Sequence, residues 1–275
     1  MRIARIAPAA LALAPQASAF QLLSGIQRTA GQVSKFPLSR RLRPSSREGT
    51  SPTTTATSSF LFNFERFFGG GAYSSGIDYE SLPHPCPELA DLALSDRVAE
   101  RSARDPGVLA ATFAGGCFWG LELTFQRVRG VAHTAVGYTR GEEGRPSYSA
   151  VCTGSTGHTE AVAVYYRPED VTYEELLGIF FGRVNPTTVN GQGKDFGPQY
   201  RTGVYYHSED QRETAQRCFD LEKERYTSPI ATELKQAAPF WPAEKYHQKY
   251  LERGGRSGVP QSAEKDATYP IDCYG

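Results

Sequence analysis

From residue 108 onward, the apolar positions switch between the two-residue period of β-strands and the 3.6-residue period of α-helices. Residues 117–127 carry Phe118, Leu121 and Phe125 at helical spacing and predict a helix. Short apolar or alternating runs predict strands over residues 108–114, 131–139 and 159–166. This part of the chain therefore predicts an alternation of strands and helices.

The strongest helical pattern begins at Tyr173, where apolar residues recur at i, i+3, i+4, i+7 and i+8 as far as Phe181. A strand, a helix with Ser208 as its N-cap, a strand and a short helix before Gly254 follow at residues 202–207, 208–226, 229–235 and 243–253. The pattern predicts an α+β fold, a two-layer α/β sandwich, but does not determine the order of its strands.

The flanking segments divide the chain into three parts. We expect residues 1–59 to be a targeting leader and linker, 60–107 an N-terminal extension, and 108–275 the catalytic domain. The extension starts with the aromatic cluster "FLFNFERFFGGG", and its residues 81–106 are expected to wrap the domain. Residues 254–275 show no periodicity and predict a mobile tail.

The leader is rich in basic and hydroxylated residues and holds no acidic residue before Glu48, which is typical of organelle targeting. Arg2 and Arg5 precede a mildly apolar run, and "ASAF" resembles a signal-peptidase site. This arrangement is similar to the bipartite plastid leaders of algae with secondary plastids; a mitochondrial presequence is the alternative. No apolar stretch approaches the roughly 18 residues that a membrane span needs, so we expect no membrane association.

Charge identifies no partner, because 30 basic residues balance 30 acidic ones, which gives no reason to expect nucleic-acid binding. The five cysteines are widely spaced, odd in number and lack any CxxC pair. The sequence therefore predicts neither a disulfide framework nor a metal site.

One cysteine stands apart in the stretch "FAGGCFWG". Gly115 and Gly116 allow a tight turn between strand and helix, which puts Cys117 at the helix N-terminus. Free N–H groups and the helix dipole would lower the pKa of its thiol there. The pattern predicts a reactive cysteine.

The other thiols differ in their surroundings. Cys218 and Cys152 lie in apolar helix-like and strand-like contexts that favour core packing, and Cys86, between two prolines, is expected to be exposed. Cys273 lies near the end of the tail, which could extend on the order of 60 Å. A mobile second thiol suits disulfide formation with an oxidised Cys117, so Cys273 is a candidate resolving cysteine.

Several motifs closely resemble those of the peptide methionine sulfoxide reductase A family: "GGCFWG", "PSYSAVCTGSTGHTEAV", "GQGKDFGPQYRTGVYY", "AEKYHQKYL" and the terminal "CYG". The resemblance covers residues 109–275. It implies a ferredoxin-like plait and reduction of the S-epimer of methionine sulfoxide, free or in proteins. It also implies a monomer that thioredoxin recycles and that needs no metal or organic cofactor.

By the same resemblance, Cys117 is the nucleophile, Glu160 protonates the sulfoxide oxygen, and Cys273 forms a disulfide with Cys117. Phe118 and Trp119 match the walls that receive the substrate methyl group. Three polar residues match the groups that hold the oxygen and the acid: Tyr148, Asp195 and Tyr200. Burial near aromatic rings would raise the pKa of Glu160 and keep it protonated near neutral pH.

The chain departs from the family where a further tail cysteine and an "HDP" motif are usual. Ala267 occupies the first position and Val184–Asn185–Pro186 the second, so Cys273 alone would resolve the sulfenic acid and the local loop contacts are open.

Two other functions compete. Cys117 with His158 or His247 as its base would give a cysteine acyl-transfer hydrolase, although a hydrogen-bonded structural role suits His158 better. A sulfoxide-binding module without catalysis is the third candidate.

Overall fold

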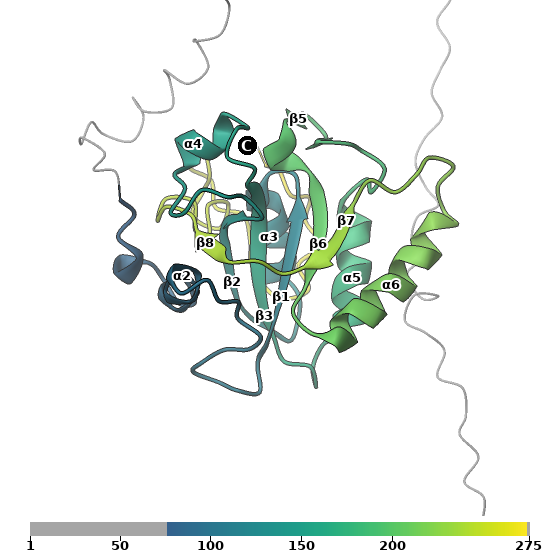
Figure 1. The fold of residues 1–275 in the computed structure, drawn as a ribbon, viewed down its shortest axis with the longest axis horizontal. Helices are drawn as coiled ribbons and strands as arrows, with labels where there is room; N and C mark the ends of the chain where they lie inside the picture. Colours follow the sequence, from purple (N-terminus) through teal and green to yellow (C-terminus); the bar gives the residue numbers. More distant parts are fainter. Residues whose placement is uncertain (1–75, 274–275) are drawn as a thin grey trace, which may run out of the picture. The chain divides into compact units, whose positions relative to one another are not determined.

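The computed structural model describes residues 76–273, so the predicted leader, the linker and the aromatic cluster at residues 60–71 lie outside the described residues. Six strands form one mixed sheet in the order β7-β6-β1-β3-β2-β8 (Figure 1). Their bounds are β1 (Leu109–Gly115), β2 (Val131–Thr139), β3 (Thr159–Tyr166), β6 (Thr202–Tyr206), β7 (Glu233–Gln236) and β8 (Phe240–Pro242). Only β6 and β7 run parallel among these neighbours. The predicted combination of strands and helices is confirmed.

The helices of the described residues are η1 (Tyr79–Ser81), α2 (Cys86–Leu94), α3 (Phe118–Gln126), α4 (Tyr148–Cys152), α5 (Tyr173–Arg183), η2 (Pro198–Tyr200) and α6 (Glu209–Lys223). A separate hairpin consists of β4 (Gly191–Gln192) and β5 (Asp195–Phe196). Side-chain caps fix two helix starts: Thr172 and Glu175 form a capping box on α5, and Ser208 accepts the N–H of Gln211 on α6.

One face of the sheet carries bulky side chains and packs against the helices. Phe113 of β1 stacks against Phe125 of α3 at 4.8 Å and Phe180 of α5 at 5.4 Å between ring centroids. The helices α5 and α6 lie side by side (Figure 1). These contacts fix α3, and with it Cys117, against the sheet.

The opposite face of the sheet combines alanines with a few aromatic side chains, since neighbouring residues of a strand point to opposite sides. Ala110, Ala135 and Ala163 lie in a buried cluster with Leu82 and Leu89 of the N-terminal extension. The extension thus covers the face that the helices leave free.

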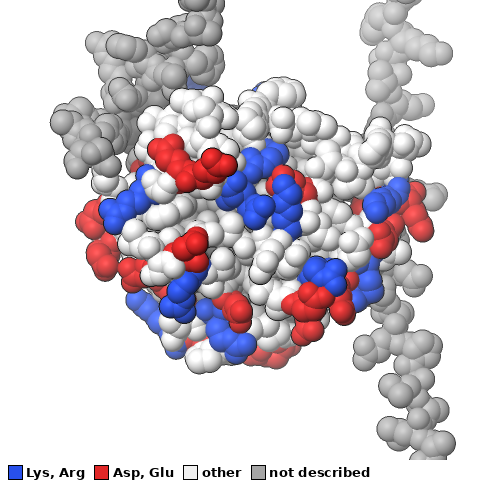
Figure 2. All heavy atoms as spheres, viewed as in Figure 1, with Lys and Arg blue, Asp and Glu red and all other residues white. Residues whose placement is uncertain are grey.

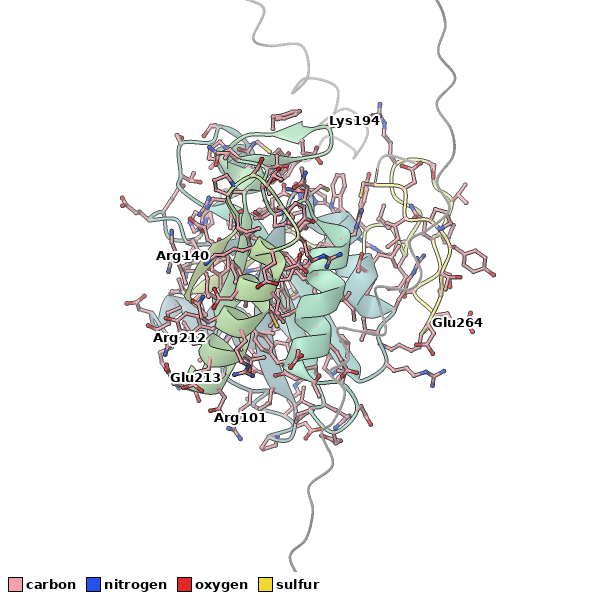
Figure 3. All side chains as sticks on the ribbon, turned by 90° about the vertical axis from the view of Figure 1, so that its right-hand side faces the viewer. Arg101, Arg140, Lys194, Arg212, Glu213 and Glu264 are labelled. Atoms are coloured by element: carbon pink, nitrogen blue, oxygen red, sulfur yellow. The ribbon has the colours of Figure 1, made fainter. Side chains whose placement is uncertain are left out.

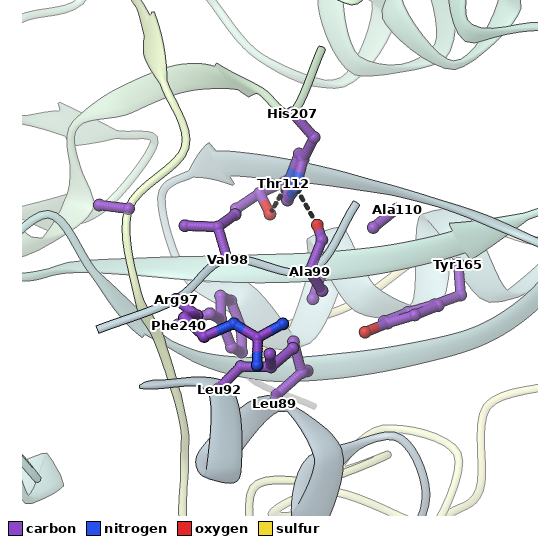
Figure 4. A pocket seen from close by; sticks show the side chains of 12 residues that line it. Leu89, Leu92, Arg97, Val98, Ala99, Ala110, Thr112, Tyr165, His207 and Phe240 are labelled. Carbon is purple, nitrogen blue, oxygen red and sulfur yellow. Dashed lines mark hydrogen bonds between the residues drawn. The ribbon is translucent and has the colours of Figure 1, made fainter. Parts of the chain in front are cut away.

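The small cavity between the extension and the sheet contains a structural histidine (Figure 4). His207 bonds to Thr112 Oγ1 at 2.9 Å and to the carbonyl of Ala99. Burial lowers its pKa to about 4, so His207 is neutral there and links the extension to β1.

The helix predicted over residues 243–253 is wrong, because a run of turns occupies residues 245–258. The side chain of Gln248 accepts the N–H of Val136 at 3.0 Å and donates to its carbonyl at 2.9 Å. Lys249 has a φ of 54°. Contacts with β2 therefore override the local helical pattern.

The strand-like interpretation around Cys152 is also wrong, because this residue ends α4. The hydroxyl of Ser147 accepts the N–H of Ala150 and caps the short helix.

The tail has no regular secondary structure over residues 259–273 but is hydrogen-bonded to the domain. Lys265 Nζ donates to the carbonyls of Gln126, Val128 and Val131 at 2.7–2.9 Å, where a cation complements the end of α3. Arg127 donates to the carbonyls of Ser262 and Tyr269. Figure 3 shows the yellow tail beside the helices, with Glu264 labelled on it. The predicted mobility of the tail stays a prediction.

The visible face in Figure 2 intersperses acidic and basic side chains without a patch of one sign. Among residues 76–273, the helices are too short or too polar to cross a bilayer.

Candidate active site

Cys117 caps the N-terminus of α3, directly after the turn that ends β1. Gly116 has a φ of 75°, and a Cβ there would lie 2.6 Å from Cβ of Gln192. Both the conformation and the close approach of β4 require glycine. The predicted glycine turn, with the cysteine at the start of a helix, is confirmed.

The predicted lowering of the Cys117 pKa is wrong for the substrate-free site. Burial raises the pKa of this thiol well above its usual range, and the nearby Glu160 and Cys273 act in the same direction. The backbone N–H of Trp119 lowers it but does not compensate. Desolvation outweighs the helix terminus, so Cys117 is a thiol at neutral pH.

Glu160 lies on β3 with only 2% of its surface exposed. One of its carboxyl oxygens accepts the N–H of Phe118 at 3.0 Å, which ties the acid to the residue after Cys117. Burial raises its pKa to about 8, and the charge of Asp195 adds to this shift. The expectation of a carboxyl that is protonated near neutral pH is confirmed.

The three other polar residues surround this pair. Burial and the charge of Glu160 raise the pKa of the Tyr148 and Tyr200 hydroxyls, which therefore remain hydrogen-bond donors. Asp195, on β5, is close enough to raise the pKa of both Cys117 and Glu160. The fold brings all of them to one site.

Two aromatic side chains stand next to the nucleophile. Phe118 is buried and lies 5.9 Å from Tyr138 between ring centroids. Trp119 is partly exposed, stacks on Tyr250 at 4.0 Å, and donates from Nε1 to His247 Nδ1 at 3.0 Å. These contacts hold both rings in place beside Cys117.

His158 and His247, the alternative bases, have other partners. His158 accepts the N–H of Gly141 at Nδ1 and bonds to the carbonyl of Glu143 through Nε2. Burial lowers the pKa of His247 to about 3, and its Nδ1 is engaged by Trp119. The predicted structural role of His158 is confirmed, and the geometry does not favour a cysteine-histidine hydrolase.

Glu244 is a site residue that sequence reasoning missed. Its carboxylate accepts the N–H of Tyr148 at 2.8 Å and the hydroxyl of Tyr138 at 2.9 Å. It links α4 to β2 and so positions Tyr148. No local signal in the sequence indicated this role, because Glu244 lies in the segment 243–253 that the pattern predicted to be a helix.

The tail brings Cys273 to the first turn of α3, where its sulfur accepts a hydrogen bond from Arg183 Nη2 at 3.4 Å. Burial raises its pKa, while the Arg183 guanidinium lowers it. Both Cys117 and Cys273 are free thiols here.

Of the other three cysteines, two are buried in the core and one contacts a site residue. Cys218 is buried as expected, whereas the predicted exposure of Cys86 is wrong, since it is fully buried beneath the sheet. Cys152 is half-buried and hydrogen-bonds to Tyr148.

In the loop where Val184–Asn185–Pro186 replace the usual "HDP" motif, a side chain bonds to the loop backbone. Gln192 accepts the N–H of Asn185 at 2.8 Å and donates to its carbonyl at 2.7 Å. Val184 is buried against Gly115. Among the described residues, no group of three or more potential metal ligands is assembled.

A family model described as peptide methionine sulfoxide reductase matches residues 109–268. The chain is 49% identical over 165 residues to the chloroplastic peptide methionine sulfoxide reductase A4 of Arabidopsis thaliana, which covers 60% of this chain and 64% of that relative, less than two thirds of its length. Identity to the peptide methionine sulfoxide reductase of Brassica napus is 43% over 202 residues, covering 72% of this chain and 77% of the relative.

The solved structures agree in fold. The reduced form of Mxr1 from Saccharomyces cerevisiae aligns with a TM-score of 0.53 at 33% identity and covers 57% of this chain and 90% of that one. Since the family model matches more than half of the sequence, the chain belongs to the peptide methionine sulfoxide reductase family.

Proposed function

We propose that this protein reduces the S-epimer of methionine sulfoxide, free and in polypeptides, to methionine. The observation that carries the proposal is the protonated, buried carboxyl of Glu160, which is hydrogen-bonded to the first residue of the helix that Cys117 caps. The names of the relatives supply the substrate, and the S-epimer follows from their type A designation.

In the first step the Cys117 sulfur attacks the sulfoxide sulfur while Glu160 protonates the sulfoxide oxygen. A sulfoxide is a poor electrophile until its oxygen is protonated, so the acid must act together with the nucleophile. Glu160 recovers a proton from the thiol, and the oxygen leaves with the Cys117 sulfur. Methionine and a sulfenic acid on Cys117 are the products, with no net uptake of protons.

Tyr148 and Tyr200 donate hydrogen bonds to the sulfoxide oxygen, and Asp195 helps to keep Glu160 protonated. Phe118 and Trp119 receive the S-methyl group, because their fixed rings form an apolar surface next to Cys117. The residues thereby divide into those that hold the oxygen and those that recognise the methyl group.

In the second step the Cys273 sulfur displaces the hydroxyl group of the sulfenic acid, which leaves as water and forms the Cys117–Cys273 disulfide. Reduced thioredoxin then restores both thiols, and no metal or organic cofactor takes part. The proximity of Cys273 to Cys117, felt in the pKa of Cys117, supports this assignment.

We further infer a ferredoxin-like plait at the core and a monomeric protein. The connectivity β1-α3-β2-β3-α5-β6, with antiparallel neighbours in the order β6-β1-β3-β2, supports the plait. We also propose a plastid location, supported by the chloroplastic relative, with the mitochondrion as the alternative.

The single most informative experiment assays the two sulfoxide epimers separately, with dithiothreitol as reductant. We expect methionine from the S-epimer and none above background from the R-epimer. Equal rates on the two epimers would contradict the proposed function, and so would a lack of methionine from both. Hydrolysis of a thioester by Cys117 would instead support the acyl-transfer alternative.

A further inference from the structure

The tail sulfur lies where only a glycine leaves room for it. A Cβ at position 120, in the first turn of α3, would overlap Sγ of Cys273 and lie 2.7 Å from Nη2 of Arg183. Glycine inside a helix costs about 1 kcal/mol relative to alanine. Gly120 therefore has a steric reason to be in the sequence "GGCFWG", independent of the turn formed by Gly115 and Gly116.

Arg183 closes this space from the last turn of α5. Its guanidinium donates to Sγ of Cys273 at 3.4 Å. In the described part of the chain, it forms no ion pair with a carboxylate. Its positive charge is therefore directed at the tail sulfur.

The charged groups around Cys273 lie on α5, on β5 and in the tail itself. Arg183 of α5 lowers its pKa, whereas Asp195 of β5 and the adjacent Asp272 raise it together with burial. Cys117 faces it from the start of α3. Arg183 is the cation that offsets these acids, since a nearby positive charge favours the thiolate.

A pair of backbone contacts fixes the residue before the thiol. Gln261 donates to the carbonyl of Asp272 at 2.6 Å and accepts its N–H at 3.1 Å. The position of Cys273 is thus defined on both sides, by Gln261 along the tail and by Arg183 across from it.

We propose that Gly120 and Arg183 form a dock for the resolving thiol, in which Gly120 provides the space and Arg183 holds the sulfur and stabilises its thiolate during disulfide formation. The proposal rests on the proposed function, since it assumes that Cys273 resolves the sulfenic acid. In this step the electron pair of the Cys273 sulfur forms the S–S bond and the S–O bond of Cys117 breaks. The departing hydroxide takes up a proton as water, so that Cys273 is oxidised and Cys117 is reduced.

The test is a single turnover of the full chain with S-sulfoxide and no external reductant. The rate of methionine release reports the first step, and the rate of disulfide formation reports the second. We follow the ratio of the second rate to the first across neutral and alkaline pH. For Arg183→Met we expect the ratio to fall roughly three- to tenfold at neutral pH, since the gain in thiolate nucleophilicity only partly compensates its lower population. The deficit should shrink at alkaline pH, and Arg183→Lys should recover most of the ratio.

Arg127→Met is the matched comparison, because Arg127 holds the tail through the carbonyls of Ser262 and Tyr269 without touching the sulfur. It should lower the ratio equally at every pH. For Gly120→Ala, which favours the helix, we expect slower disulfide formation from a folded protein.

A wild-type ratio in both Arg183→Met and Gly120→Ala would overturn the dock, and a pH-independent deficit in Arg183→Met would overturn thiolate stabilisation. Failure of the proposed function is recognised separately, because the wild-type chain would then release no methionine from the S-sulfoxide in the first step.

Discussion

The raised pKa values of the Glu160 carboxyl and the Cys117 thiol keep both groups neutral at rest, although the proposed mechanism uses one as an acid and the other as a nucleophile. Burial raises the pKa of each, and the charge of Glu160 would raise that of Cys117 further. The pair therefore stays uncharged until a substrate oxygen takes the proton of Glu160.

Replacing Glu160 with Gln should slow methionine formation by roughly 10²- to 10⁴-fold, because the general acid is lost while the shape is kept. In the wild type, the rate of the first step should fall as the pH rises through about 8, since Glu160 then loses its proton. Rapid-quench measurement of methionine across this range tests both effects.

Glu122→Gln is the control, as it alters another buried carboxyl on α3 that bonds elsewhere, to Thr134 and Lys249. In this variant the rate of the first step should still fall as the pH rises through about 8. An unchanged rate in Glu160→Gln at neutral pH would remove Glu160 from the mechanism.

At this scale the sequence predicted the turn and the helix terminus at Cys117, because both depend on adjacent residues. It did not predict the direction of the pKa shift of Cys117. That shift depends on burial and on the acids Glu160 and Asp195, which only the folded chain brings near.

Among the elements, α3 connects the nucleophile to the irregular segment over residues 243–258. Glu122 of α3 is 1% exposed, accepts the hydroxyl of Thr134 at 3.1 Å and accepts the N–H of Lys249 at 2.9 Å. Burial raises its pKa to about 7. The carboxyl holds in place the segment that supplies His247 and Tyr250.

This raised pKa makes stability depend on pH. Between the ordinary pKa of a glutamate, near 4.5, and about 7, the folded protein keeps the proton that the unfolded chain releases. The contribution is complete below this window and is lost as the pH rises through it, by about 3 kcal/mol at most. Glu122→Gln should flatten the dependence in urea unfolding at acidic and alkaline pH.

Glu122→Ala should destabilise the protein at acidic pH by about 1–3 kcal/mol, because the N–H of Lys249 loses its acceptor. The difference from the wild type should shrink at alkaline pH, since the variant lacks the titrating carboxyl. If Glu122→Gln kept the slope of the wild type, the pH dependence would have to come from another group.

The longer strands and helices followed from periodicity, and Ser208 gave a correct helix start. The helix predicted over residues 243–253 failed because of distant partners: the Gln248 side chain bonds to the backbone of β2, and the backbone N–H of Lys249 donates to the Glu122 carboxyl. Local patterning carries no information on such partners.

At the scale of the whole molecule, the alanines of the sheet explain why the N-terminal extension belongs to the structure. They lie in the buried cluster that Leu82, Leu89 and Cys86 of the extension complete. The sequence suggested an extension around the domain, but the exposure expected for Cys86 was wrong because the receiving surface is assembled from three strands.

The tail carries Cys273, the cysteine proposed to complete each catalytic cycle. Cys273→Ser should retain methionine formation in a single turnover but lose nearly all turnover with thioredoxin, because the sulfenic acid of Cys117 has no resolving partner. A coupled assay of thioredoxin oxidation measures this loss. Cys152→Ser, also half-buried near the site, should keep thioredoxin turnover, and Cys273→Ser turning over at the wild-type rate would refute the resolving role.

We expect residues 1–59 to direct the protein to its compartment. A fusion of residues 1–60 to a fluorescent protein should accumulate in plastids, as the basic, acid-poor leader predicts. Microscopy against a mitochondrial marker separates the alternative, and fluorescence spread through the cytosol would reject the leader.

The protonated state of Cys117 also affects how fast oxidants would inactivate the protein. Peroxides and alkylating agents react with thiolates and only slowly with thiols. Since burial raises the pKa of Cys117, the proposed nucleophile should stay protonated until substrate arrives and so react slowly with the oxidants that create methionine sulfoxide.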